Sequence, residues 1–204
     1  MILALTVLAS LQTPNASAFF PLAPGTTWIW NEVTAGIPET VKEVAMPPIT
    51  VGGKSAAYIL ITLPNQPSER AYFYIQGNTV YNAAYIEARP FAKPLPVLVV
   101  SGKKETWTYE GTLPLPSGDF VTKQTGTSEP GKPVEAFGKS LPSYVVQIDA
   151  ELTSPSGEKV RSVTKSTYVE GIGLFESEMS ADTGAMKFSR KRTLTKFELP
   201  GGPK

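Results

Sequence analysis

After residue 20, the sequence is a succession of short runs of β-branched and aromatic residues, separated by Gly, Pro, Asn and Ser. No stretch there keeps apolar residues at the helical period of about 3.6. Residues 144–153, YVVQIDAELT, instead alternate between apolar and polar positions. Strands without helical crossovers between them predict an all-β fold with an antiparallel meander sheet. Long polar strands near the C-terminus favour one strongly curved sheet, a half-barrel or open barrel with a solvated outer face, over a sandwich.

The clearest hairpin is predicted at residues 70–85, where Gly77-Asn78 separates two alternating runs. Two Pro-rich stretches, residues 46–48 and 89–96, are predicted to be connections, because Pro cannot donate to a strand ladder. The second lies near the midpoint of the chain. Residues 120–127 are polar and are expected at an edge or on an exposed strand. Further strands are predicted at residues 26–34, 56–63, 96–100, 105–112, 158–169, 174–179 and 186–199.

The sequence contains a weak internal echo. Residues 24–30 and residues 101–109 each have a Gly turn followed by a strand with two aromatic residues, Trp28 and Trp30 in one and Trp107 and Tyr109 in the other. Positions two apart in a strand share one face of the sheet. The echo indicates either a duplicated half-domain or a coincidence between two β-rich segments.

The N-terminus has the features of an export signal. Residues 2–11, ILALTVLASL, form an apolar run that is too short for a membrane span, which needs about 20 residues. Ala16-Ser17-Ala18 is a small-residue cleavage site, so we expect a signal peptide at 1–18, a single domain at 19–199 and a flexible tail at 200–204. The mature chain is then periplasmic or extracellular, and no later segment could span a membrane. The alternative is an N-terminal core helix or strand.

Composition excludes several classes of activity. The chain has no His and no Cys, so it lacks imidazole bases, thiolate nucleophiles, disulfides and a lipid anchor through cysteine. The net charge of +1 argues against nucleic acid as a partner. Carboxylate, Lys, Tyr or Ser chemistry, or no chemistry at all, remains; we expect no enzyme activity, no catalytic residue, no cofactor and no metal site.

Four short motifs are interpreted as turns or bends. Asp182-Thr183-Gly184 matches the aspartic-protease string, but no second copy supplies a partner carboxylate, so a hairpin turn is the preferred reading. Gly53-Lys54-Ser55 and Gly138-Lys139-Ser140 lack the earlier glycine of a phosphate-binding loop and are also read as turns. Gly171-Ile172-Gly173 is expected to mark a bulge or a close backbone crossing.

Aromatic and basic residues supply the candidate ligand site. Aromatic side chains on sheets usually belong to the core, but a curved open sheet can also line a pocket with them. Arg190 and Arg192 alternate with Phe188 and Leu194; they form either an anion-recognising concave wall or, as the preferred reading, a charged strand that protects a sheet edge. The predicted ligand-binding residues are Trp28, Trp30, Tyr72, Tyr74, Trp107, Tyr109, Arg190 and Arg192.

The segment from Phe20 to Trp30, FPLAPGTTWIW, resembles the F-P-L-x-x-G-x-x-W-x-Y opening of a broad set of uncharacterised bacterial exported proteins and lipoproteins. Residues 102–109 resemble the second W-x-Y of that set, and residues 168–174, YVEGIGL, resemble its Y-x-x-G-V-G-L motif. The resemblance spans about residues 19–198. It implies a curved antiparallel sheet similar to the half-barrels that carry lipoproteins, and it implies no activity. This chain lacks the anchoring Cys of the lipoprotein members.

Three function classes follow, in order of preference. The first is an exported non-catalytic module that binds an apolar or amphipathic small molecule or lipid between its curved sheet and residues 89–96. The second is an envelope module that contacts another protein through a strand edge or face. The third is a hydrolase that uses paired carboxylates.

Overall fold

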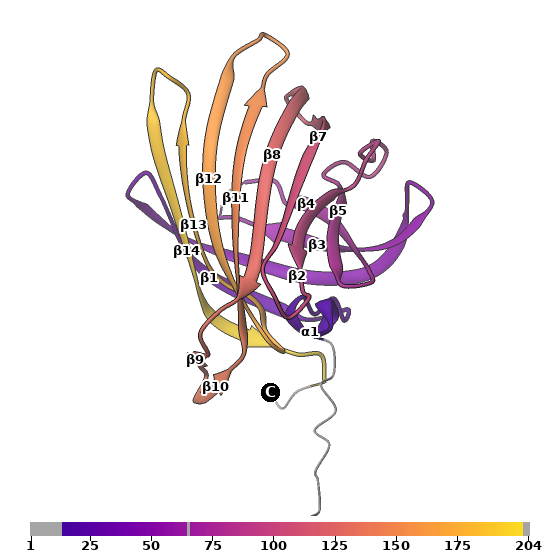
Figure 1. Cartoon of the computed structure of the whole chain (residues 1–204), viewed down its shortest axis with the longest axis vertical. Coiled ribbons are helices and arrows are strands. Elements are labelled where there is room, and N and C mark those ends of the chain that lie inside the picture. Colours follow the sequence, from indigo (N-terminus) through magenta and orange to yellow (C-terminus); the bar gives the residue numbers. More distant parts are fainter. Residues whose placement is uncertain (1–13, 65, 202–204) are drawn as a thin grey trace, which may run out of the picture.

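The computed structural model describes residues 14–64 and 66–201, which form an all-β antiparallel sheet of twelve strands (Figure 1). The sheet curves into a nearly closed barrel, as the alternation pattern predicts. Its strands, in sheet order, are β6 (Leu95–Val99), β5 (Thr79–Ala84), β4 (Glu69–Gln76), β3 (Lys54–Thr62), β2 (Ile37–Val51), β1 (Thr27–Thr34), β14 (Lys187–Glu198), β13 (Gly173–Asp182), β12 (Lys159–Val169), β11 (Ser143–Thr153), β8 (Gly118–Pro130) and β7 (Glu105–Leu115). A separate hairpin contains β9 (Val134–Ala136) and β10 (Lys139–Leu141).

The sheet has two six-stranded halves that meet where the first strand pairs with the last. Each strand of the first half, β1 to β6, pairs with the strand before it, and the second half returns from β7 to β14 in the same way. β1 then pairs with β14, from Thr27 opposite Glu198 to Thr34 opposite Arg190. The two echoing segments, which hold Trp28 and Trp107, thus open the two halves of the sheet.

Side chains, and not a strand ladder, close the gap between β6 and β7. The Ser128 hydroxyl on β8 donates to the Val99 carbonyl at 2.6 Å, and the Gln124 amide donates to the Pro96 carbonyl at 3.4 Å. These bonds satisfy carbonyl groups of an edge strand that has no ladder partner on that side. The barrel is therefore complete except at this seam.

The prediction that residues 46–48 are a connection is wrong, because they lie within β2. The ladder with β3 shifts register between Met46 and Ile49, and the ladder with β1 ends at Val44. Pro47 and Pro48 thus occupy a bulge beside an unpaired edge, where no backbone donor is required. The β2 strand itself was not recognised in the sequence.

Neither strand for which a sheet edge was predicted lies at an edge; for residues 120–127 the other alternative, an exposed strand, fits better, because every second side chain from 119 to 125 is exposed. β8, which contains residues 120–127, lies between β7 and β11, and β14 lies between β13 and β1. The charges of β14 do not protect an edge. On its outer face Lys191 pairs with Glu178 of β13 at 2.6 Å, and on the inner face Arg192 pairs with carboxylates of β1 and β2.

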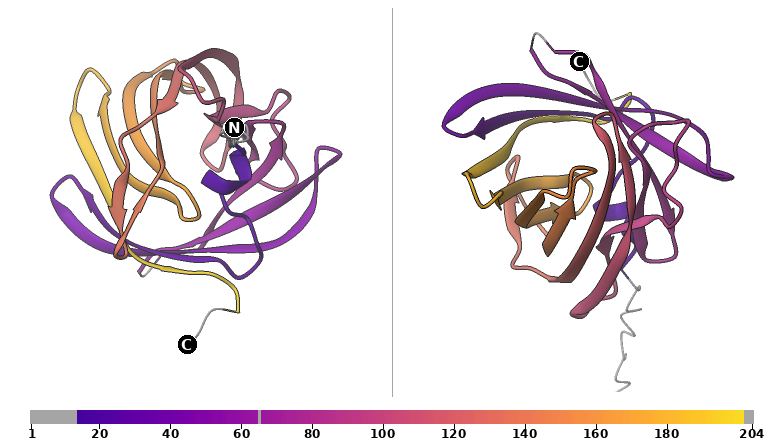
Figure 2. Two further views of the ribbon diagram at one scale, coloured as in Figure 1. Left: turned by 60° about the horizontal axis from the view of Figure 1, so that its bottom comes forward. Right: turned by 90° about the horizontal axis from the view of Figure 1, so that it is seen from above.

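A short helix, α1 (Ala16–Phe19), lies inside the curve of the sheet (Figure 2). Ala16 and Phe19 are buried, and the Phe19 ring meets Tyr144 edge-on at 4.9 Å. The Ala18 carbonyl accepts a hydrogen bond from the Gly171 amide at 2.7 Å. The predicted cleavage bond after Ala18 therefore falls within α1; cleavage itself stays a prediction, and residues 1–13 of the predicted signal lie outside the described part. Within residues 14–64 and 66–201, no helix has the length and apolarity to cross a membrane.

The glycine motifs have the predicted backbone roles. Gly173 has a φ of +93°, and a Cβ there would lie 3.2 Å from the Pro21 ring, so the chain crosses closely at this point. Gly184 has a φ of +80° and donates its amide to the Asp182 carboxylate at 2.7 Å, which makes residues 182–184 a turn. In each Gly-Lys-Ser string the glycine lies in the turn, and the Lys and Ser begin the strand that follows, β3 or β10.

Candidate functional site

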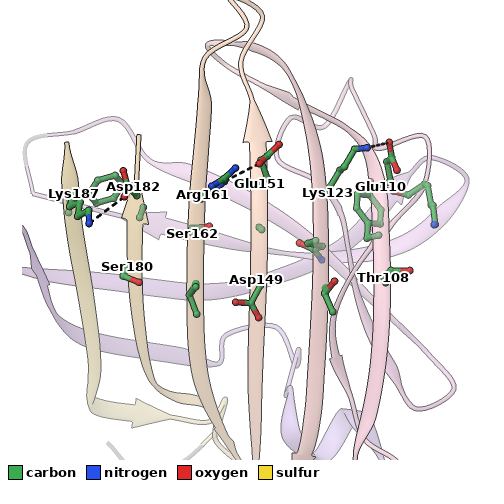
Figure 3. Close-up of a pocket in the computed structure, with 18 residues that line it drawn as sticks. Thr108, Glu110, Lys123, Asp149, Glu151, Arg161, Ser162, Ser180, Asp182 and Lys187 are labelled. Carbon is green, nitrogen blue, oxygen red and sulfur yellow. Dashed lines mark hydrogen bonds and ion pairs between the residues drawn. The ribbon is translucent and has the colours of Figure 1, made fainter. Parts of the chain in front are cut away.

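A groove of about 860 Å³ crosses the concave face of the second half of the sheet (Figure 3). Its floor is one row of direct cross-strand neighbours, with small residues in the middle and an aromatic ring at each end. The row is Tyr109, Gln124, Ala150, Ser162, Ala181 and Phe188. Lys93, from the Pro-rich connection, covers the end of the groove at Tyr109: its ammonium lies 5.3 Å from the ring centroid and its carbonyl accepts from the hydroxyl at 2.8 Å.

The neighbouring row carries charges of alternating sign across the same six strands. It consists of Glu110, Lys123, Glu151, Arg161, Asp182 and Lys187, all labelled in Figure 3. Three ion pairs form within the row, the tightest at 3.1 Å between Lys123 and Glu110 and between Arg161 and Glu151. Hydrogen bonds from Lys159 and Arg161 lower the pKa of the Glu151 carboxyl. These residues border the groove, but because their charges satisfy one another, the row supports strand register more than ligand binding.

A second cavity, of about 360 Å³, lies inside the barrel. Apolar side chains from both halves wall it: Phe20, Trp28, Trp30, Ile59, Ile61, Phe73, Val97 and Leu174. Phe188 lines the groove, whereas Arg190 and Arg192 line the cavity, and all three point to the same face of β14. Consecutive residues on one face of a strand are about 7 Å apart, so the groove and the cavity lie next to each other.

One wall of the cavity is an ion cluster that we call the Arg192 clasp: Arg192, Glu32, Glu43 and the ring of Trp30. The Nη2 of Arg192 donates to Glu43 at 2.7 Å, and its Nε lies 2.8 Å from a Glu32 oxygen, although the N–H is not aligned with that oxygen. The guanidinium carbon lies 4.7 Å from the Trp30 ring centroid. The side chain of Arg192 is 13% exposed and both carboxylates are 10% exposed, so the clasp ties β14 to β1 and β2 in a dry environment.

Arg190 differs from Arg192 in having no partner. It is half-buried on the cavity wall and forms no ion pair or side-chain hydrogen bond with the residues that the structure describes. Tyr85 also lines this cavity: burial raises the pKa of the Tyr85 hydroxyl, and a hydrogen bond with Asn82 and the charge of Arg190 oppose that rise.

The structure divides the predicted ligand-binding residues. Trp28, Trp30, Arg190 and Arg192 meet at the cavity, where the Trp28 indole donates to the Ile172 carbonyl at 2.7 Å. Tyr109 lies at the groove.

The other three predicted residues line neither space. Tyr72 packs on Tyr58, Tyr74 stacks on Tyr81 at 5.2 Å, and Trp107 lies close to Gly126. Tyr72 and Tyr74 point to the face of β4 opposite Phe73, which does line the cavity. The sequence analysis did not predict Phe20, Phe73 or the two clasp carboxylates as site residues. The alternation of β4 could have indicated Phe73, since it puts that ring on the face opposite Tyr72 and Tyr74.

Comparisons with known proteins give two similar structures. No protein-family model matches this chain, and no curated protein matches it. A "putative exported protein with YmcC-like fold" from Bacteroides fragilis is 10% identical, with a TM-score of 0.47 over 89% of this chain and 99% of the other. A "putative lipoprotein" from Parabacteroides distasonis is 12% identical, with a TM-score of 0.48 over 88% of this chain and 98% of the other.

Proposed function

We propose that this chain is an exported, non-catalytic module that binds an apolar or amphipathic ligand on the concave side of its sheet. The observation that carries the proposal is the aromatic-walled cavity of about 360 Å³ beside an open groove of about 860 Å³. Ligand pockets in proteins typically enclose about 300–1,000 Å³ of mostly apolar space with a few polar groups. The proposed export rests on the apolar run at 2–11 and the small residues that follow it.

The energetics favour a ligand that remains bound through purification. A buried methylene contributes about 0.8 kcal/mol, so ten of them contribute on the order of 8 kcal/mol before ordering costs. The ligand would enter through the groove, which Lys93 of the Pro-rich connection covers at one end only.

Native mass spectrometry of the purified chain, before and after solvent extraction, tests the proposal. We expect extra mass before extraction and the bare chain afterwards, with uptake of a hydrophobic dye only by the extracted protein. Ala71 is buried on the cavity wall, so Ala71→Phe should fill the space and abolish both signals.

Ala185→Phe is the matched control, because Ala185 is exposed beyond β13 and should leave binding unchanged. Thermal melts of both variants show whether the larger side chain in the core has disturbed the fold. An extracted wild-type protein that takes up no dye and no lipid would contradict the proposal.

A second candidate, contact with another envelope protein, rests on Phe137. This residue lies in the turn between β9 and β10, is 56% exposed and has a φ of +50°. A bulky side chain in that conformation is strained, and strain at an exposed position is often associated with function. A photocrosslinker placed at position 137 tests this candidate. Capture of one defined envelope protein from position 137, and of none from position 183 in the turn after β13, would support this candidate over the first.

A further inference from the structure

We propose that the ligand is an anionic amphiphile and that Arg190 binds its acidic head group. The inference rests on the proposed function and adds the chemical class of the ligand. A carboxylate and a phosphate share the required chemistry, namely anionic oxygens that accept hydrogen bonds from a guanidinium.

The first argument is the unused capacity of Arg190. A guanidinium has five N–H donors, and none of those on Arg190 meets an acceptor among the described residues. Arg192, two residues along the same face, engages two carboxylates. Because an unpaired charge is costly to bury, the half-buried Arg190 is the group in the cavity that gains most from an anion.

The second argument concerns the competing carboxylates. Glu43 lines the same cavity but is held by Arg192 at 2.7 Å, so its charge is already compensated. Glu69 also lines the cavity, but it is exposed and screened by water. Tyr85 lines the same cavity, and its hydroxyl is a second group there that can donate to a bound anion.

The third argument is the position of Arg190 between a polar and an apolar compartment. Towards the groove, the next residue on its face of β14 is Phe188, followed across the sheet by the small and polar residues of the groove floor. The cavity that Arg190 lines is also lined by the rings of Phe20 and Phe73, which contact each other at 5.1 Å. A head group at Arg190 would thus place its tail among these rings.

Displacement of a fluorescent fatty acid from the extracted chain tests the inference, with all competitors below their micellar concentrations. Laurate and dodecyl phosphate should compete 10- to 100-fold better than dodecanol, since a hydrogen bond to a charged group contributes that factor. Lengthening the acid from eight to twelve carbons should tighten binding roughly fourfold per methylene until the cavity is full.

Variants of β14 assign the effect to one side chain. Arg190→Met should reduce the advantage of the acids over dodecanol to less than threefold, and Arg190→Lys should retain part of it. Lys191→Met, the neighbour on the outer face, is the matched control and should leave the advantage unchanged. Melting curves of all three variants confirm that the fold is retained.

The outcomes separate the inference from the proposed function. Equal binding of dodecanol and laurate, or tighter binding of dodecyltrimethylammonium, overturns the anionic head group and leaves the cavity as a binding site. An acid preference that survives Arg190→Met also overturns the inference. If no amphiphile of any charge binds, the proposed function fails and the inference fails with it.

Discussion

Replacing Arg192 by methionine should destabilise the fold severely, because it leaves two buried carboxylates without a counter-ion. Glu32 and Glu43 are each 10% exposed, and the guanidinium between them also covers the ring of Trp30. Removing one partner of a buried ion pair costs about 3–5 kcal/mol, whereas whole domains are stable by only about 5–15 kcal/mol. We therefore expect Arg192→Met to lose about 3–5 kcal/mol at neutral pH.

Urea unfolding followed by tryptophan fluorescence measures this loss. Arg161→Met is the matched control, since that side chain is 77% exposed and solvent screens its ion pair with Glu151, so we expect little change in stability. Adding Glu32→Gln and Glu43→Gln to Arg192→Met should restore part of the stability, because these side chains then carry no charge that needs a counter-ion. A loss below about 1 kcal/mol with an unchanged urea slope would refute the reasoning.

Three further predictions follow from single positions. Phe137→Asn should raise the free energy of unfolding by about 1 kcal/mol, because Asn tolerates positive φ, whereas Phe137→Ala should bring no gain in the same urea assay. Asp182→Asn should cost well under about 1 kcal/mol and Gly184→Val clearly more, in thermal melts, since only the glycine requires its φ of +80°. The folded full-length chain should resist signal peptidase between Ala18 and Phe19, because the carbonyl of that bond is hydrogen-bonded inside the barrel, whereas the urea-unfolded chain should be cut there. If N-terminal sequencing of the exported protein finds Met1, cleavage does not occur.

Local patterns in the sequence were enough to predict the fold class and most strands. Alternation of side chains in residues 144–153, and the Gly77-Asn78 turn, are properties of neighbouring residues, and both elements form where the pattern places them. The same alternation correctly puts Trp28 with Trp30, and Arg190 with Arg192, on shared faces. The alternation also places Phe73 on the face of its strand opposite Tyr72 and Tyr74.

The tertiary structure alone decided which distant strands meet and which face of each is enclosed. The pairing of β1 with β14 joins residues more than 150 positions apart, and only that pairing brings Arg192 to Glu32 and Glu43. Because of this pairing, β14, which was predicted to be an edge strand, is a central strand, and Arg190 lies on the wall of a cavity. Alternation within a strand specifies a side chain's face relative to its own neighbours, but the energy of an ion pair or a cavity depends on side chains supplied by other strands, which no local pattern encodes.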